Sequence, residues 1–108
     1  MNQNPSTGLS IEVSALVFQI GQRRCAFPVG WIAEIVAIAA LDKLPGMPTI
    51  LEGFLNLAGT ITPVVRLDRL FQLPDFSPSL YAPLIVLKGL GQPLAVLVEK
   101  AEAVARFR

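Results

Sequence analysis

Residues 53–68, with the sequence GFLNLAGTITPVVRLD, limit the possible folds of this chain more than any other segment. A turn at residues 58–60 separates two apolar runs, and the second run, residues 61–66, is rich in β-branched side chains and predicts a strand. Pro63 lies within that strand and cannot donate a ladder hydrogen bond, which predicts an edge strand or a bulge. Residues 67–73 then predict a helix of about two turns.

Further apolar runs, separated by links that contain glycine, predict two β-hairpins. The expected strands are residues 14–20 with 25–27 and residues 84–87 with 94–98, and residues 99–108 alternate in a way that fits a last strand. Residues 50–57 are expected to be partly helical and partly extended. Residues 28–35 are interpreted as a short helix, because proline suits a first helical turn and apolar side chains recur at helical spacing. The alternation of Ile32, Glu34 and Val36 fits a strand as well.

These elements predict a single domain at residues 14–108, preceded by a flexible polar tail at residues 1–13. Short strands with glycine and proline turns favour a mostly-β barrel with two short helices. Apolar residues make up 53% of the chain and charged residues 16%, against about 45–50% and about 25% in typical domains. This excess predicts that part of the apolar surface contacts a partner.

The residue types argue against catalysis and against metal or cofactor binding. Histidine is absent, so the usual base beside a nucleophile is missing. Cys25 is the single cysteine, and its apolar neighbours favour a buried structural role in a reducing compartment such as the cytoplasm. One soft ligand cannot build a zinc site, and the scattered carboxylates suit no calcium site. We therefore expect that the protein is not an enzyme and that it binds neither a metal ion nor a cofactor.

Charge and hydropathy limit the partners further. Nine basic and eight acidic residues give a net charge of +1, which offers no nucleic-acid surface. Residues 31–41 are the longest apolar candidate, but they contain Glu34 and are shorter than the roughly 18 residues that span a membrane. We therefore expect a soluble cytoplasmic protein that holds its partners by packing.

Two side chains in this apolar segment leave alternatives open. Trp31 fits a core contact or an exposed anchor for a partner, since tryptophan is enriched at interface hot spots. Glu34 is the only charge between Arg24 and Asp42, so it must reach solvent or find a partner. It fits a solvated position on an amphipathic element or a polar contact at the edge of an apolar binding face.

Residues 53–68 resemble the central motif of the CheW-like domain, the adaptor fold of bacterial chemotaxis arrays. Gly53, Asn56, Leu57 and Gly59 match the family's G-x-x-N-L-R-G core, and Pro63 continues the match. The flanking similarities cover residues 16–28 (first hairpin), 31–36 (a V-x-E-I segment), 44–48 (a loop) and 94–99 (a G-x-x-V-D strand). In total, the resemblance extends over residues 15–107.

The resemblance implies two small β-barrel subdomains and a non-catalytic adaptor. In that family, one apolar face meets the cytoplasmic tips of chemoreceptors, and a second face meets the CheW-like regulatory domain of the CheA histidine kinase. The partner-binding residues implied by position are Ile32, Glu34, Gly53, Asn56, Leu57, Ala58 and Gly59. Glycine would allow close approach or positive φ, and the asparagine can bond its own backbone to fix the turn.

This sequence also departs from the family pattern in charge and in length. Ala58 stands where the family usually has arginine, which removes a charge that can pair with partner carboxylates, and Arg66 stands where aspartate is common. The family normally continues through a further loop and a last strand–helix segment, so we expect a C-terminally shortened fold with an unpaired strand edge. Such an edge invites self-association or a partner domain.

Three functions follow as hypotheses. The first is an adaptor that couples chemoreceptors to a CheA-type kinase. The second is a CheW-like assembly or regulatory subunit outside chemotaxis that acts through self-association. The third is a small-molecule enzyme or binder that uses an apolar pocket.

Overall fold

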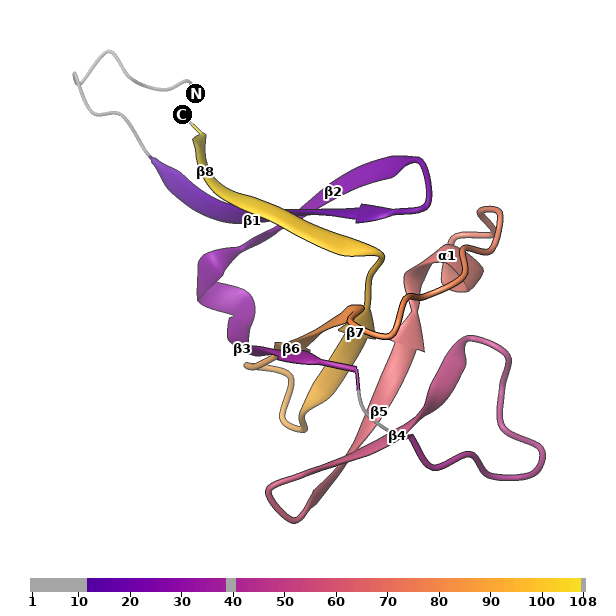
Figure 1. Ribbon diagram of the computed structural model, residues 1–108. Helices are drawn as coiled ribbons and strands as arrows, with labels where there is room; N and C mark the ends of the chain where they lie inside the picture. Colours follow the sequence, from indigo (N-terminus) through magenta and orange to yellow (C-terminus); the bar gives the residue numbers. More distant parts are fainter. Residues whose placement is uncertain (1–11, 39–40, 108) are drawn as a thin grey trace, which may run out of the picture.

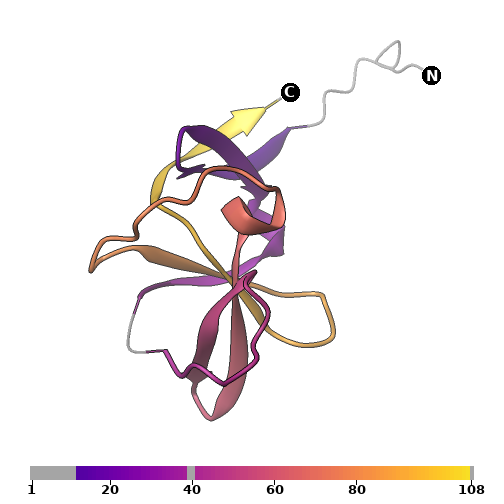
Figure 2. The same cartoon turned by 90° about the vertical axis from the view of Figure 1, so that its right-hand side faces the viewer.

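The computed structural model describes residues 12–38 and 41–107, which form two β-sheets (Figure 1). In chain order the elements are β1 (Val13–Ile20), β2 (Arg23–Pro28), the 3₁₀ turn η2 (Val29–Trp31), β3 (Ile32–Ala37), β4 (Leu51–Leu57), β5 (Thr60–Arg66), α1 (Leu67–Leu70), β6 (Pro83–Leu87), β7 (Leu94–Leu97) and β8 (Lys100–Phe107). In both views, the smaller sheet lies at one end of the molecule and the β4–β5 hairpin at the other (Figures 1 and 2).

The smaller sheet has three strands in the order β2-β1-β8, and both outer strands run antiparallel to β1. Leu16 of β1 pairs with Phe27 of β2 and with Val104 of β8. The predicted first hairpin is therefore confirmed, and the alternating C-terminal segment does form a strand. A bulge in β8 shifts its register between Val17 and Phe18.

The larger sheet has five strands in the order β3-β6-β7-β5-β4. The predicted second hairpin is confirmed as the antiparallel pair β6–β7, and β4 pairs antiparallel with β5. Strands β5 and β7 pair in parallel, because α1, residues 71–82 and β6 carry the chain back before β7 begins. This order places β6 and β7 in the interior of the sheet.

The core lies on both faces of β6 and β7, whose side chains alternate from one face to the other. On one face, Ile85 and Val96 pack with Phe18 of β1, which joins the two sheets. On the other face, Leu84 packs with Val64 of β5 and further residues of the β4–β5 hairpin. Burial on both faces explains why β6 and β7 are near-continuous apolar runs.

Two of the expected helices differ from the structure. The helix expected at residues 28–35 is wrong: only η2 is helical, and Ile32–Ala37 is strand β3. The alternation of apolar and polar residues was the correct signal here, because the edge of β6 offers a partner to β3 that helical spacing does not reveal. The helix expected at residues 67–73 is present but ends at Leu70, and Gln72 has a φ of 58°.

The structure also corrects the expectations of a closed barrel and of an edge or bulge position for Pro63. Over residues 12–38 and 41–107, neither sheet closes into a barrel; β2 and β8 are the edges of the smaller sheet, and β3 and β4 those of the larger one. Pro63 lies in an interior strand, where the ladder to β7 begins only at the next residue, Val64. Most of the expected flexible tail, residues 1–11, lies outside the described residues, whereas Val13 already belongs to β1.

Candidate functional site

The β4–β5 turn has the backbone of a tight hairpin. Ala58 and Gly59 are its two central residues, with φ of 52° and 87°. Positive φ at both central positions is the pattern of a type I′ turn, which matches the twist of the flanking strands. The Gly59 amide also donates a hydrogen bond of 2.8 Å to the Asn56 Oδ1 atom. The expected turn is thus present, and the Asn56 side chain is used to fix it.

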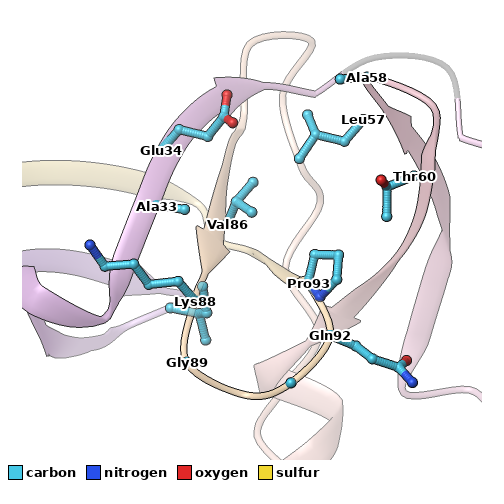
Figure 3. Close-up of a pocket in the computed structure, with 12 residues that line it drawn as sticks. Ala33, Glu34, Leu57, Ala58, Thr60, Val86, Lys88, Gly89, Gln92 and Pro93 are labelled. Atoms are coloured by element: carbon cyan, nitrogen blue, oxygen red, sulfur yellow. The ribbon is translucent and has the colours of Figure 1, made fainter.

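This turn borders an open depression of about 530 Å³ on one face of the larger sheet. The other walls come from the edge strand β3, the end of β6 and the β6–β7 loop. Figure 3 shows Leu57 and Val86 facing each other across the depression, with Glu34 beside them on β3. The full lining is Ala33, Glu34, Leu57, Ala58, Thr60, Val86, Leu87, Lys88, Gly89, Gly91, Gln92 and Pro93.

Two charged side chains lie at this depression, and both are exposed. Neither Glu34 nor Lys88 forms an ion pair with any residue in the described ranges. Their positions are nevertheless fixed, because Glu34 pairs with Val86 in the β3–β6 ladder and the Lys88 amide donates to the Trp31 carbonyl oxygen at 2.9 Å. The site therefore offers an apolar floor with the Glu34 carboxylate beside it, while Lys88 lines the rim and its side chain projects outward (Figure 3).

The structure brings together three of the seven expected partner-binding residues, namely Glu34, Leu57 and Ala58. Asn56 and Gly59 support the adjoining turn. Ile32 is half-buried and packs against the core on the face toward β1.

Gly53 is buried and serves the fold rather than the depression. A Cβ atom at this position would lie 2.8 Å from the Asp42 carbonyl oxygen and 2.9 Å from the Leu41 Cβ. The backbone of residues 41–42 approaches β4 this closely because Asp42 and Phe54 exchange two hydrogen bonds, of 2.8 and 2.9 Å. Gly53 therefore does allow a close approach, and the group that approaches it is the backbone of residues 41–42 of the same chain.

Sequence reasoning missed the β6–β7 loop, which supplies Lys88, Gln92 and Pro93 to the depression. Its two glycines, Gly89 and Gly91, were interpreted only as a hairpin turn. Both have positive φ, of 82° and 80°, so they do shape the loop. No local signal in the sequence places this loop beside the β4–β5 turn; the parallel pairing of β5 with β7 does so.

Arg66 is not available for recognition, because its side chain is buried at the other end of β5. Its guanidinium donates two hydrogen bonds to Asp68, of 3.0 and 2.6 Å, and one of 3.1 Å to Glu52. A further hydrogen bond of 2.7 Å reaches the Phe76 carbonyl oxygen, and the guanidinium lies 4.7 Å from the centre of the Phe76 ring. Arginine suits such a site because its planar fork satisfies several acceptors at once.

Ion pairing also determines how this buried cluster titrates. Burial alone would raise the pKa of the Asp68 carboxyl, but the hydrogen bonds and charge of Arg66, with the Phe76 and Arg69 amides, hold it below its ordinary value. The hydrogen bond to Asp68 raises the pKa of Arg66 further. The pair is therefore fully charged near neutral pH, and burial is tolerated because each charge has its partners.

The fold and the site together define a small two-sheet β domain whose candidate functional feature is a contact surface. The family model of the CheW-like domain matches residues 14–108, and the chain belongs to this family. Among solved structures, the scaffolding protein TtCheW from Thermoanaerobacter tengcongensis matches 88% of this chain at 25% sequence identity, with a TM-score of 0.82. The match covers 65% of that protein, so the present chain spans less than two thirds of its length.

No curated protein sequence matches the chain. Within the described ranges, no helix has the length and apolar character needed to cross a bilayer. The same residues contain no group of three or more histidine, cysteine or acidic side chains arranged to hold a metal ion.

Proposed function

We propose that this protein is a non-catalytic cytoplasmic adaptor that couples the tips of chemoreceptors to a CheA-type histidine kinase. The observation that carries the proposal is the open depression between β3 and the β4–β5 turn, in a chain of the CheW-like family. It has an apolar floor, and its Glu34 and Lys88 side chains make no ion pair within the described part of the chain. Free charges around an apolar centre suit recognition of a protein surface.

Each of the expected residues has a distinct role in this proposal. Leu57 supplies apolar contact, and Glu34 pairs with a basic side chain of the partner. Asn56 and Gly59 hold the turn that presents Leu57 and Ala58. Gly53 and Ile32 contribute indirectly, by packing the strands that form the walls.

Calorimetric titration with the regulatory domain of a CheA-type kinase, and separately with a receptor tip, tests the proposal. The variant Glu34→Lys is expected to weaken binding of one of them about 10-fold or more, because it places like charges at the contact. Glu99→Lys is the matched control, since Glu99 is an exposed carboxylate outside the depression. No binding by the unmodified protein, or equal losses in both variants, would contradict the proposal.

Ala58 provides a second test, because it lies at the depression where the family usually has arginine. We expect Ala58→Arg to increase affinity for the kinase or receptor by restoring a charge that pairs with partner carboxylates. Gln22→Arg adds the same charge at the exposed β1–β2 turn and is expected to leave affinity unchanged. A gain in both variants would indicate nonspecific electrostatic attraction instead.

A second function, an assembly subunit that acts through self-association outside chemotaxis, is favoured by a different observation. Large apolar side chains remain exposed away from the depression, above all Leu80 and Tyr81, each 83% exposed. A protein that self-associates and binds neither kinase nor receptor would favour this function over the first.

A further inference from the structure

A small pocket lies between the β1–β2 turn and the segment that follows α1. Its volume is about 320 Å³, at the lower end of the roughly 300–1,000 Å³ found for ligand pockets. The turn is tight, because Gly21, the first of its two central residues, has a φ of 61°, as in a type II′ hairpin turn. The lining residues are Ile20, Gly21, Gln22, Arg23, Leu73, Pro74 and Asp75. The two walls of the pocket therefore come from parts of the chain that are far apart in the sequence.

Arg23 is a charged residue on the side of β2 that faces the core. Side chains alternate along a strand, and Cys25 and Phe27, on the same side of β2 as Arg23, pack against the core. Arg24 lies on the opposite side and pairs with Glu102. Arg23, by contrast, forms no ion pair with any side chain that the structure describes. One wall of the pocket therefore carries a cation that has no partner in the fold.

Asp75 supplies a carboxylate to the other wall. Its Oδ2 atom lies 3.2 Å from both the Nε and the Nη2 atoms of Arg69, whereas its Oδ1 atom has no partner among the described residues. Arg69 also donates to the Thr49 carbonyl oxygen at 3.1 Å, and the Leu73 amide donates to the Asp68 carbonyl oxygen at 2.7 Å. This wall is therefore fixed before any ligand arrives, which reduces the entropy that is lost on binding.

Arg23 and Asp75 have opposite charges and line the same pocket, yet they form no ion pair with each other. A molecule that carries both charges reaches each of these groups with one of its ends. We propose that the pocket binds a small zwitterion, whose carboxylate pairs with Arg23 and whose ammonium group pairs with Asp75. The planar guanidinium suits a carboxylate because it can donate two parallel hydrogen bonds. The chain between the two charges lies against Ile20, Leu73 and Pro74.

A ligand with a single charge suits this pocket less well than a zwitterion. An anion beside Arg23 is repelled by the Asp75 carboxylate, and a cation beside Asp75 is repelled by the Arg23 guanidinium. A zwitterion places a favourable charge at both positions and brings no net charge into the pocket. Because both side chains are exposed to water, each contact is weak, and we expect a Kd of about 1–10 mM.

Nuclear magnetic resonance titration of the isotope-labelled full chain with γ-aminobutyrate tests the proposal. This probe joins a carboxylate and an ammonium group by a short apolar chain. The backbone amide signals of Gly21, Gln22, Leu73 and Asp75 are expected to shift and to reach saturation as the probe is added. Butyrate and butylammonium, each with one of the two charges, are expected to bind about 3-fold more weakly or less at the same ionic strength.

Substitutions of the two charged residues complete the test. Arg23→Gln and Asp75→Asn are each expected to weaken binding of γ-aminobutyrate about 3-fold or more, because one ionic contact is lost. Arg24→Gln is the control for Arg23, since Arg24 lies on the other side of β2 and pairs with Glu102. Arg69→Gln is the control for Asp75, because it removes the same ion pair but keeps the carboxylate in the pocket. Both controls are expected to bind the probe like the unmodified chain.

Three outcomes would overturn the proposal. The first is the absence of a saturable shift up to about 50 mM of the probe, well above the expected Kd. The second is equal binding of all three probes, which would indicate a general effect of salt. The third is a loss in Arg69→Gln as large as that in Asp75→Asn, which would mean that the carboxylate only positions the wall. Because this pocket shares no residue with the depression beside Glu34, its failure leaves the adaptor proposal intact.

Discussion

Charged side chains are buried at one end of strand β5 and exposed at the other. At its last residue, Arg66 is buried and its guanidinium bonds Asp68, Glu52 and the Phe76 carbonyl oxygen. At its first residue, the strand leaves an exposed turn beside Glu34, which has no ion partner within the described ranges. At the Arg66 end, the charged groups stabilise the fold. At the turn end, the Glu34 carboxylate remains available to contact a partner.

The residues that stabilise this chain are therefore different from those proposed to contact a partner. Substitutions near Arg66 should change the free energy of unfolding, because buried charges lose partners there. Substitutions of Glu34 or Lys88 should change it by less than about 0.5 kcal/mol, because exposed side chains without partners contribute little.

Removing the buried guanidinium should have the largest effect on stability. Arg66→Ala leaves Asp68, which is fully buried, without its partner, and we expect a loss of about 3–5 kcal/mol in the free energy of unfolding. Urea denaturation measures it. Arg24→Ala is the control, because Arg24 also pairs with a carboxylate, that of Glu102, but is exposed, and a loss of at most about 1 kcal/mol is expected. Equal losses would remove the contrast between buried and exposed pairs.

Gly53→Ala should cost about 1–3 kcal/mol, because the new methyl group would press into the backbone of Asp42 and the side chain of Leu41. Thermal or urea unfolding provides the value. Gly30→Ala is a matched control, since a Cβ atom there meets nothing within 4 Å. If both alanine variants unfold alike, the close approach at residues 41–42 is not what requires glycine.

Acid should destabilise the protein through Asp68. The pKa of the Asp68 carboxyl is lower in the folded state than in the unfolded chain, where aspartate titrates at about 3.9. The stabilisation is therefore complete above the unfolded-state pKa and is lost as the pH falls through the folded-state pKa. Unfolding free energies measured from pH 7 to pH 3 should show this loss, and Asp68→Asn should reduce the slope. An unchanged slope in that variant would assign the acid sensitivity to other carboxylates.

The smallest expected effect is a gain at the exposed end of β5. Ala58 has a φ of 52°, which disfavours alanine, whereas asparagine tolerates this region and suits the position before glycine in a type I′ turn. Ala58→Asn should therefore add about 0.5–1 kcal/mol to the free energy of unfolding. Ala26→Asn, at an exposed strand alanine, should give no gain. A lower free energy of unfolding in Ala58→Asn would mean that replacing the alanine side chain costs more than the relief of the backbone conformation contributes.

The sequence was most informative where the structural cause is local. The turn at Ala58 and Gly59, the Asn56 hydrogen bond and both hairpins follow from residue types a few positions apart. The segment Ile32–Ala37 was misassigned because its helical spacing and its alternation compete, and pairing with β6 decided the outcome. The buried role of Arg66 does not follow from the sequence, because one acceptor, Glu52, lies 14 positions away.

The amino-acid sequence alone is enough to assign the family, the mostly-β class and the turn of the central hairpin. These depend on glycine, asparagine and proline at fixed positions, where φ and local hydrogen bonds are decided within a few residues. Which charged side chains are buried and which are exposed depends on the tertiary structure. That outcome depends on the strand order, which brings β3, the β4–β5 turn and the β6–β7 loop around one depression and leaves Arg66 inside the fold.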